Sequence, residues 1–420
     1  MQSSTIKSVI EFIILLVALA TTASLLSAIA RRIINERRYA CLDRWREILR
    51  KKSSHILLSD TLPLPNDLSE FSASAGSIKW QAMEDVLCDF MNEKKHREKV
   101  KIVFSRLGYA AFYEKRLKSH NTIIRASAVD KLGTMLSESS GDKLADMLND
   151  KSPEVIAVTL RALGKIGSTK GLKNILDQLP DLLEKGFVSR KTVERSLINF
   201  GKGAVPLFLE YGKTCKNPEM IASILEVLFH LEAKEALPFA INQLRHTNPE
   251  VRARALKCIG TIAIDPTEFD GGQLVPWLHD SVWFVRLQAA NALGNIKYKK
   301  APHELGKLLL DEKWQVRNAA ATALGKIGEA SLDIFLNILR SNDQYAKQSV
   351  CEEIEKTGLA YRLIEDLDGP VGTSCKSSKE ILKIMAFLKF DSPLGEYLKK
   401  GKNDTIKKEI SDILNREAAV

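Results

Sequence analysis

Cysteine pairs are absent from this 420-residue sequence, although it contains six cysteines. The six are Cys41, Cys88, Cys215, Cys258, Cys351 and Cys375. They lie far apart, none belongs to a Cys-x-x-Cys pair, and none has a histidine at zinc-site spacing. A disulfide framework and a zinc finger are therefore excluded, and the pattern is typical of a reducing compartment.

Catalytic signatures are missing as well. The chain has no P-loop, no dinucleotide-binding glycine fingerprint, no Gly-x-Ser-x-Gly, no His-Glu-x-x-His and no EF-hand loop. Its seven histidines are scattered. We therefore predict that the protein is not an enzyme and has no catalytic residues, no cofactor and no metal.

An excess of basic residues is present, but it lies near the front of the chain. Residues 31–52 hold nine basic and three acidic residues, and residues 77–120 hold ten and six. Residues 121–420 are nearly balanced, with 42 basic and 39 acidic residues. A helical array that grips nucleic acid needs a basic surface along its length. Nucleic-acid binding therefore remains only an alternative, and nucleic acid is not the expected partner.

One long apolar segment stands out. Residues 12–30 form an uncharged run of 19 residues, and at about 1.5 Å per residue this matches a bilayer core. The basic residues follow the run, so the positive-inside rule places the N-terminus outside and the rest of the chain in the cytoplasm. We predict a single-pass protein of the inner (cytoplasmic) membrane. A cleaved signal peptide, suggested by Ala28 and Ala30, is the alternative, but its basic residues would precede the run.

The basic flank at 31–52 is predicted to be a juxtamembrane helix. Its first arginines either bind anionic lipid headgroups or only fix the topology, and both roles can hold together. These candidates are Arg31, Arg32, Arg37 and Arg38. The next segment, 53–77, is rich in proline, serine and glycine and is predicted to be a linker.

Self-similarity dominates the rest of the chain. The segments that begin at Pro153, Ser281 and Glu312 share a loose Val-[Arg/Ile]-x3-[Ala/Leu]-x-Ala-Leu-Gly-x-Ile pattern. Its apolar positions fall on one helix face. A second amphipathic segment follows each motif, for example at Ala236 and Ser331. Each unit is therefore predicted to be two helices, and such pairs bury their apolar faces only by stacking.

Residues that are typical of helix starts and helix ends support this division into pairs. Prolines such as Pro153 and Pro249 follow a serine or asparagine, which suits the first turn of a helix. The glycine after Leu293 suits either a helix end or a close contact between two backbones.

These motifs resemble the HEAT-repeat family, in particular phycobilisome-lyase-like HEAT repeats. The resemblance rests on VRLQAANALGNI at Val285 and VRNAAATALGKI at Val316. Further matches lie at 153–167 and 249–260, with partial ones at 124–133, 193–201, 220–231 and 346–358. The whole is similar to bacterial HEAT proteins with one N-terminal membrane helix. The resemblance implies an all-α solenoid of about eight helix pairs after one transmembrane helix, and a scaffold for protein partners.

The resemblance also raises two enzymatic alternatives. Di-iron hydroxylases among HEAT proteins need several His-Glu pairs, and only His303-Glu304 occurs here, so that reading is excluded. A chromophore-lyase-like or other accessory subunit remains an alternative.

The predicted organisation has six parts. They are a tail and anchor at 1–30, a basic helix at 31–52, a linker at 53–77, an N-terminal helical cap at 78–119, HEAT-like repeats at 120–367 and a C-terminal helical cap at 368–420.

Candidate partner-binding residues come from two adjacent repeats. Interface anchors are enriched in Trp and Arg. The candidates are Trp283, Trp314, Arg286, Arg317, Lys313 and Trp277. The structural alternative is that the rings pack between repeats and that the arginines bond to Asp280 and Asp311 of the preceding turns. We predict a scaffold or adaptor for a cytoplasmic protein or a protein of a membrane complex.

Overall fold

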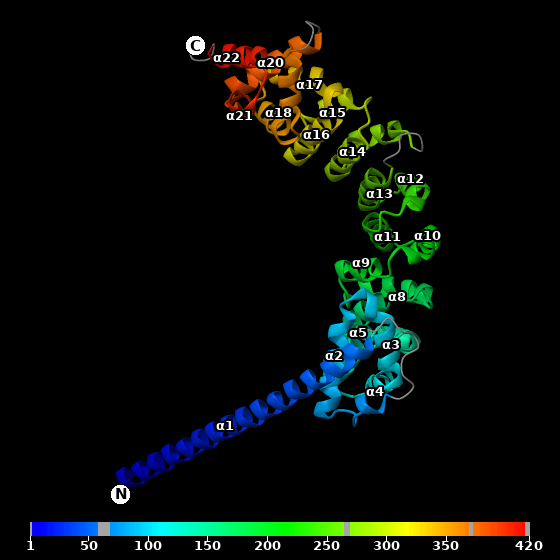
Figure 1. The fold of residues 1–420 in the computed structure, drawn as a ribbon, viewed down its shortest axis with the longest axis vertical. Coiled ribbons are helices and arrows are strands. Elements are labelled where there is room, and N and C mark those ends of the chain that lie inside the picture. The colour runs from blue at the N-terminus through cyan, green and yellow to red at the C-terminus, as the bar shows by residue number, and fades with distance from the viewer. Residues whose placement is uncertain (1, 58–67, 264–268, 369–372, 416–420) are drawn as a thin grey trace. The chain divides into compact units, whose positions relative to one another are not determined.

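The computed structural model describes residues 2–57, 68–263, 269–368 and 373–415. These residues form 22 α-helices and short 3-10 helices, and the described ranges contain no strand (Figure 1). The chain divides into two compact units, Met1–Gly171 and Leu172–Val420. The predicted all-α class is confirmed.

The first unit begins with the longest helix of the chain. Its helices are α1 (Gln2–Leu57), α2 (Ile78–Met91), α3 (Arg97–Arg106), α4 (Tyr109–Arg116), α5 (Thr122–Thr134), α6 (Gly141–Asp146) and α7 (Pro153–Ile166). A short 3-10 turn, η1 (Ser69–Phe71), precedes α2.

The second unit contains the remaining helices. They are α8 (Leu172–Glu184), α9 (Arg190–Ile198), α10 (Val205–Thr214), α11 (Pro218–His230), α12 (Leu237–Gln243), α13 (Pro249–Ile262), α14 (Trp283–Asn295), α15 (Pro302–Leu308), α16 (Trp314–Ile327), α17 (Leu332–Arg340), α18 (Gln344–Lys356), α19 (Leu359–Glu365), α20 (Thr373–Phe387), α21 (Ser392–Lys400) and α22 (Asp404–Asn415). A 3-10 helix, η7 (Gly271–His279), stands between α13 and α14.

Helix α1 is unbroken from the apolar segment into the basic flank. No glycine or proline occurs between Gln2 and Leu57, so no residue interrupts the backbone hydrogen-bond ladder. The predicted boundary between an anchor and a separate juxtamembrane helix is therefore not a structural break.

The predicted linker begins too early. Ser53 and Leu57 belong to the last turns of α1 and are buried. They line a small apolar site together with Met83 and Leu87 of α2. Packing against these residues stabilises the helix past residue 52, which outweighs the weak helix preference of two successive serines. Residues 58–67 of the predicted linker lie outside the described residues.

Helices follow one another in pairs within both units of the predicted repeat region. In chain order the first unit contains α5, α6 and α7, and the second contains α8 and then the pairs α9/α10, α11/α12, α13/η7, α14/α15, α16/α17 and α18/α19. Within the second unit, α9, α11, α13, α14, α16 and α18 contact one another in succession, and we call this row the Leu-Gly layer. The predicted solenoid of about eight pairs is confirmed.

Helices begin at Asn-Pro pairs, as the sequence predicts. The side chains of Asn217 and Asn248 cap α11 and α13 by accepting hydrogen bonds from backbone amides of the first turn. Proline occupies the first helical position in both. Each cap satisfies an amide that has no partner inside the helix.

The glycine of the repeated Ala-Leu-Gly motif is a contact residue. A Cβ atom built on Gly294 would lie 2.6 Å from Cα of Ala323 in the next Leu-Gly helix. The same relation joins Gly260 to Ala292, at 2.7 Å from Cα. These glycines lie inside the last turn of their helices and do not end them. Of the two predicted roles, the close contact between two backbones is therefore the one observed.

Candidate functional site

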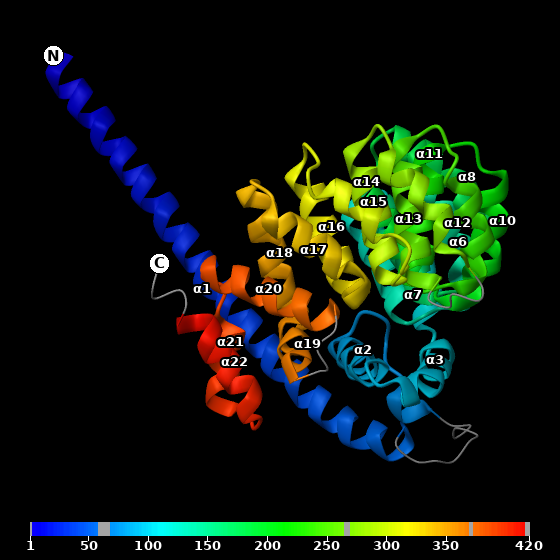
Figure 2. The ribbon, with the colours of Figure 1, turned by 90° about the horizontal axis from the view of Figure 1, so that it is seen from above.

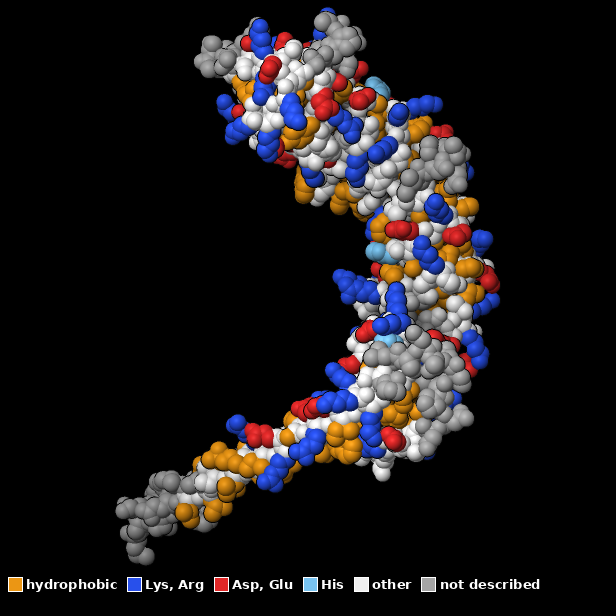
Figure 3. Space-filling model, in the orientation of Figure 1, with side chains coloured by type: hydrophobic (Ala, Val, Ile, Leu, Met, Phe, Trp, Pro, Cys, Tyr) orange, Lys and Arg blue, Asp and Glu red, His pale blue; other side chains and the backbone are white. Residues whose placement is uncertain are grey.

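The N-terminal part of α1 is apolar and uncovered. The described part of the chain contains one helix long and apolar enough to cross a membrane, and none of that apolar window is buried. Figures 1 and 2 show this end of α1 projecting away from α2 to α7 of its own unit. Figure 3 shows hydrophobic side chains on this projecting part and charged ones further along the helix. The exposed residues include Leu15, Leu16, Val17, Leu19, Leu25, Leu26 and Ile29.

The C-terminal part of α1 is docked on α2. Leu42 and Leu49 are buried and lie about three turns and one turn, respectively, before Ser53, which is buried like Leu57. Residues seven or eight apart lie on one helix face, so these side chains form a single apolar seam. Helix α1 therefore continues from an uncovered apolar segment into a packed element of the first unit.

Ion pairs run beside this seam. Arg46 donates from Nε and Nη2 to Oδ2 of Asp85, at 3.0 and 2.5 Å, and Arg50 pairs with Asp89. Arg38 donates to Gln81 at 3.2 Å. The partner residues increase in step along both helices, so α1 and α2 run parallel. The hydrogen bonding of Arg46 to Asp85 is the main cause that raises the pKa of Arg46.

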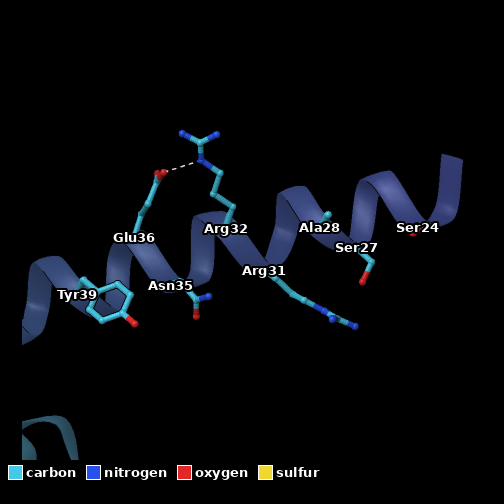
Figure 4. Close-up of a pocket in the computed structure, with 8 residues that line it drawn as sticks. All are labelled: Ser24, Ser27, Ala28, Arg31, Arg32, Asn35, Glu36 and Tyr39. Atoms are coloured by element: carbon cyan, nitrogen blue, oxygen red, sulfur yellow. Dashed lines mark hydrogen bonds and ion pairs between the residues drawn. The ribbon is translucent and has the colours of Figure 1, made fainter. Parts of the chain in front are cut away.

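The four arginines predicted to meet lipid headgroups lie where the apolar part ends. All four are exposed. Arg32 donates to Glu36 at 2.9 Å, and Arg38 belongs to the α2 contact. In Figure 4, Arg31 and Asn35 project to one side of the helix, opposite Arg32 and Glu36. The residues drawn there all come from α1, so they line a helix surface and not an enclosed site.

The tryptophans predicted to bind a partner differ in exposure. Trp283 and Trp314 are the first residues of α14 and α16, and Trp314 is 64% exposed while Trp283 is half-buried. Trp314 is therefore not a core residue.

The structure adds a third aromatic residue that the sequence reading missed. Tyr345, the second residue of α18, is 75% exposed. It follows Trp314 by 31 residues, and Trp314 follows Trp283 by the same interval. That spacing was the available signal, but it falls in a repeat whose remaining motif is degenerate. We call Trp283, Trp314 and Tyr345 the aromatic edge.

Trp277 has a structural contact. It lies half-buried in η7, with the guanidinium carbon of Arg252 6.0 Å from its ring centroid. This cation–π contact joins α13 to the following 3-10 helix. The exposed Lys313 caps α16 through its backbone, whose N–H donates to Asp311 Oδ1 at 2.9 Å.

Arg286 is a structural residue, but its carboxylate partner is not the predicted one. It donates from Nε and Nη2 to both oxygens of Asp311, at 2.8 and 3.0 Å, in the loop after its own repeat. Toward the preceding turn it reaches no carboxylate and donates from Nη1 to the carbonyl oxygens of Asp280, at 3.0 Å, and Ser281, at 3.4 Å. These two bonds tie the repeat of α14 to the next one, because a planar guanidinium matches the two oxygens of a carboxylate.

A second charged cluster crosses the Leu-Gly layer. Arg254 of α13 pairs with Glu194 of α9, Glu226 of α11 and Glu250 of its own helix, at 2.8 to 3.0 Å. Burial raises the pKa of Glu194 despite the attraction of Arg254. An opening of about 260 Å³ adjoins the cluster and is lined partly by Lys257. Because every charge here has a partner of opposite sign, the cluster fits a structural role.

The described residues contain no group of three or more His, Cys, Asp or Glu side chains arranged to hold a metal ion. None of the described cysteines forms a disulfide bond, and among them only Cys41 is exposed.

Stacked helix pairs with a shared interior define an α-helical repeat protein. Residues 273–355 match the family model described as HEAT repeats, and residues 236–264 match the model described as HEAT repeat. The chain therefore contains segments similar to HEAT repeats at these two places. The finer resemblance to phycobilisome-lyase-like repeats stays a prediction.

Solved structures resemble the chain only distantly. An engineered protein is 16% identical over 82% of this chain and 97% of its own, with a TM-score of 0.36. Kap121p and a mutant of it are each 15% identical over 81% of this chain and 50% of theirs, with a TM-score of 0.37. The chain thus spans half of Kap121p. No curated protein matches it.

Proposed function

We propose that the protein is a membrane-anchored scaffold whose repeats bind a partner protein at the cytoplasmic face of the membrane. One observation carries the proposal: α1 is a single helix, uncovered and apolar at one end and packed against α2 at the other. A helix that crosses the bilayer and then packs on α2 holds the first unit beside the membrane.

The ion pairs between α1 and α2 support a position of the first unit close to the bilayer. From the end of the apolar run at Ala30 to Arg38, the first residue that contacts α2, α1 advances eight residues. At about 1.5 Å per residue this is about 12 Å. The arginines in that interval lie at headgroup depth, where each contributes about 1 kcal/mol of attraction to an anionic leaflet.

Native Cys41 provides a test of orientation. It is exposed on α1, beyond the arginines. A membrane-impermeant maleimide should label it in inside-out vesicles and not in intact cells. The Cys41→Ser variant is the control, because the labelling that it removes belongs to Cys41. Labelling of Cys41 in intact cells would reverse the topology.

Anchoring needs its own measurement. The wild-type chain should stay in the membrane pellet after alkaline carbonate extraction, whereas Leu19→Arg combined with Leu26→Arg should move it to the supernatant. Each arginine costs about 2.5–3.5 kcal/mol at the centre of a spanning helix. Both side chains are exposed, so the substitutions leave the packed part of the chain intact. Retention of the double variant would exclude α1 as the anchor.

The aromatic edge is the proposed contact surface for the partner. Large exposed apolar side chains in a row mark interaction sites more often than isolated ones do. Replacing Trp314 and Tyr345 by alanine should weaken capture of the partner and leave the helical content unchanged. Equal capture by the folded double variant would remove this surface from the proposal.

A further inference from the structure

An arginine ladder connects successive repeats. The fourth residue of α5, α13 and α14 is an arginine that grips both carboxylate oxygens of an aspartate in the following loop, at 2.7 to 3.0 Å. The three pairs are Arg125–Asp150, Arg252–Asp280 and Arg286–Asp311. In each pair Nη1 also donates to a carbonyl oxygen six residues earlier, which fixes the plane of the guanidinium.

Each ladder aspartate is itself held by a tight turn. Oδ1 of Asp280 accepts from the N–H of Val282 at 2.8 Å, and Oδ1 of Asp311 accepts from the N–H of Lys313 at 2.9 Å. The aspartate stands three residues before the first residue of the next helix in both cases.

The ladder lacks its acceptor at α16. Arg317 is the fourth residue of this helix, and its Nη1 donates to the carbonyl oxygen of Asp311 at 2.9 Å, as in the other repeats. Three residues before α18, however, stands Ser341, whose Oγ accepts from the N–H of Asp343 at 3.3 Å. The serine reproduces the turn but brings no carboxylate. Within the described residues, no carboxylate forms a hydrogen bond or a close ion pair with Arg317; the carboxylate of Asp311, which is bound to Arg286, attracts it only from a greater distance.

The open arginine lies beside an exposed ring. Arg317 is half-buried, and Trp314 precedes it by three residues, so both side chains share one face of α16. The N-terminus of α16 adds a partial positive charge. A guanidinium with unused donors next to an uncovered indole suits a carboxylate whose chain neighbour is apolar.

We propose that Arg317 and Trp314 form a binding site for an acidic side chain of the partner protein. The partner's Asp or Glu takes the position that Asp311 holds in the preceding repeat, and an adjacent apolar residue covers the ring of Trp314. The carboxylate of Asp311 is close enough to Arg317 for the two charges to attract each other, and this nearby negative charge favours a singly charged carboxylate over a phosphate or a nucleic acid. The inference rests on the proposed scaffold function, since it names the chemistry of the partner.

The test uses a defined probe and the full chain in detergent. The blocked peptide acetyl-Gly-Leu-Asp-Leu-Gly-amide is titrated against protein with isotope-labelled arginine, and the Nε–H signal of Arg317 is followed by NMR. Loss of one signal in the Arg317→Lys variant assigns it. The Asp peptide should shift this signal, whereas the matched Asn peptide and inorganic phosphate should not at equal concentration.

Ser341→Asp is the decisive variant, because it supplies the missing carboxylate within the chain. It should raise the Tm and weaken peptide binding by about tenfold or more. Ser105→Asp adds the same charge at an exposed position of α3 and should change neither. A lowered Tm, unchanged binding by Ser341→Asp, equal binding of the Asn peptide, or an equal response to phosphate would each overturn the site. The titration needs neither membrane nor partner, so its failure is distinct from failure of the scaffold function.

Discussion

Gly294 is the position where a single methyl group tests how the repeats are held together. A Cβ atom at this residue would lie 2.6 Å from Cα and 2.8 Å from Cβ of Ala323. Carbon atoms prefer separations of about 3.5–4.0 Å, so α14 and α16 would have to move apart by about 1 Å. Overpacking of this kind costs about 1–3 kcal/mol. Replacing glycine by alanine inside a helix returns up to about 1 kcal/mol. The net loss for Gly294→Ala is therefore about 0–3 kcal/mol, centred between about 1 and 2 kcal/mol.

The chain offers a matched control. Gly395 lies inside α21, and a Cβ atom there would meet no atom within 4 Å. Gly395→Ala should therefore stabilise its helix by up to about 1 kcal/mol. Hydrogen exchange of backbone amides is the suitable assay, because repeat arrays open locally and a single global midpoint hides the effect. Exchange should become faster in α14 and α16 of Gly294→Ala and slower in α21 of Gly395→Ala. Slower exchange in both variants would refute close backbone packing as the role of the motif.

Three further outcomes are expected. Burial raises the pKa of Asp311, but the hydrogen bonds that its carboxylate accepts from Arg286 and from the backbone N–H of Lys313 outweigh burial, so its pKa lies below the ordinary value. The stability that the ionised carboxylate contributes is therefore present at neutral pH and is lost as the pH falls through the lowered pKa. Asp311→Asn should therefore cost about 1.5–3 kcal/mol at pH 7 and flatten the fall of the Tm between pH 5 and pH 3, about the range where aspartates protonate. Asp85→Ala removes the main partner of Arg46 and should loosen the part of α1 that packs on α2. Hydrogen exchange of the backbone amides at residues 42–57 should then become faster. Unchanged exchange would mean that the apolar seam alone holds α1 on α2. Burial raises the pKa of the Cys258 thiol to about 12; it should resist maleimide at pH 7.5 until denaturant is added, and rapid native labelling would contradict its burial.

Local patterns were sufficient for the class of fold and for the helix positions. The period of apolar residues and the Asn-Pro and Ser-Pro starts depend on neighbours a few residues apart, and such interactions survive in any arrangement of the helices. The apolar run at 12–30 was equally legible, since its length and lack of charge define it without reference to other segments. The 31-residue interval between Trp314 and Tyr345 was also present in the sequence, although no local motif drew attention to it.

Contacts between distant residues could be decided only by the tertiary structure. Whether Gly294 ends a helix or admits a neighbour depends on Ala323, 29 residues later. Similarly, Arg286 binds the following aspartate and not the preceding one, because the next repeat stacks against its side chain. The extension of α1 to Leu57 depends on burial against α2, which no propensity of two serines and a histidine indicates. The sequence shows which charged and apolar side chains can form contacts, whereas the packing of the folded chain determines which contacts they already form.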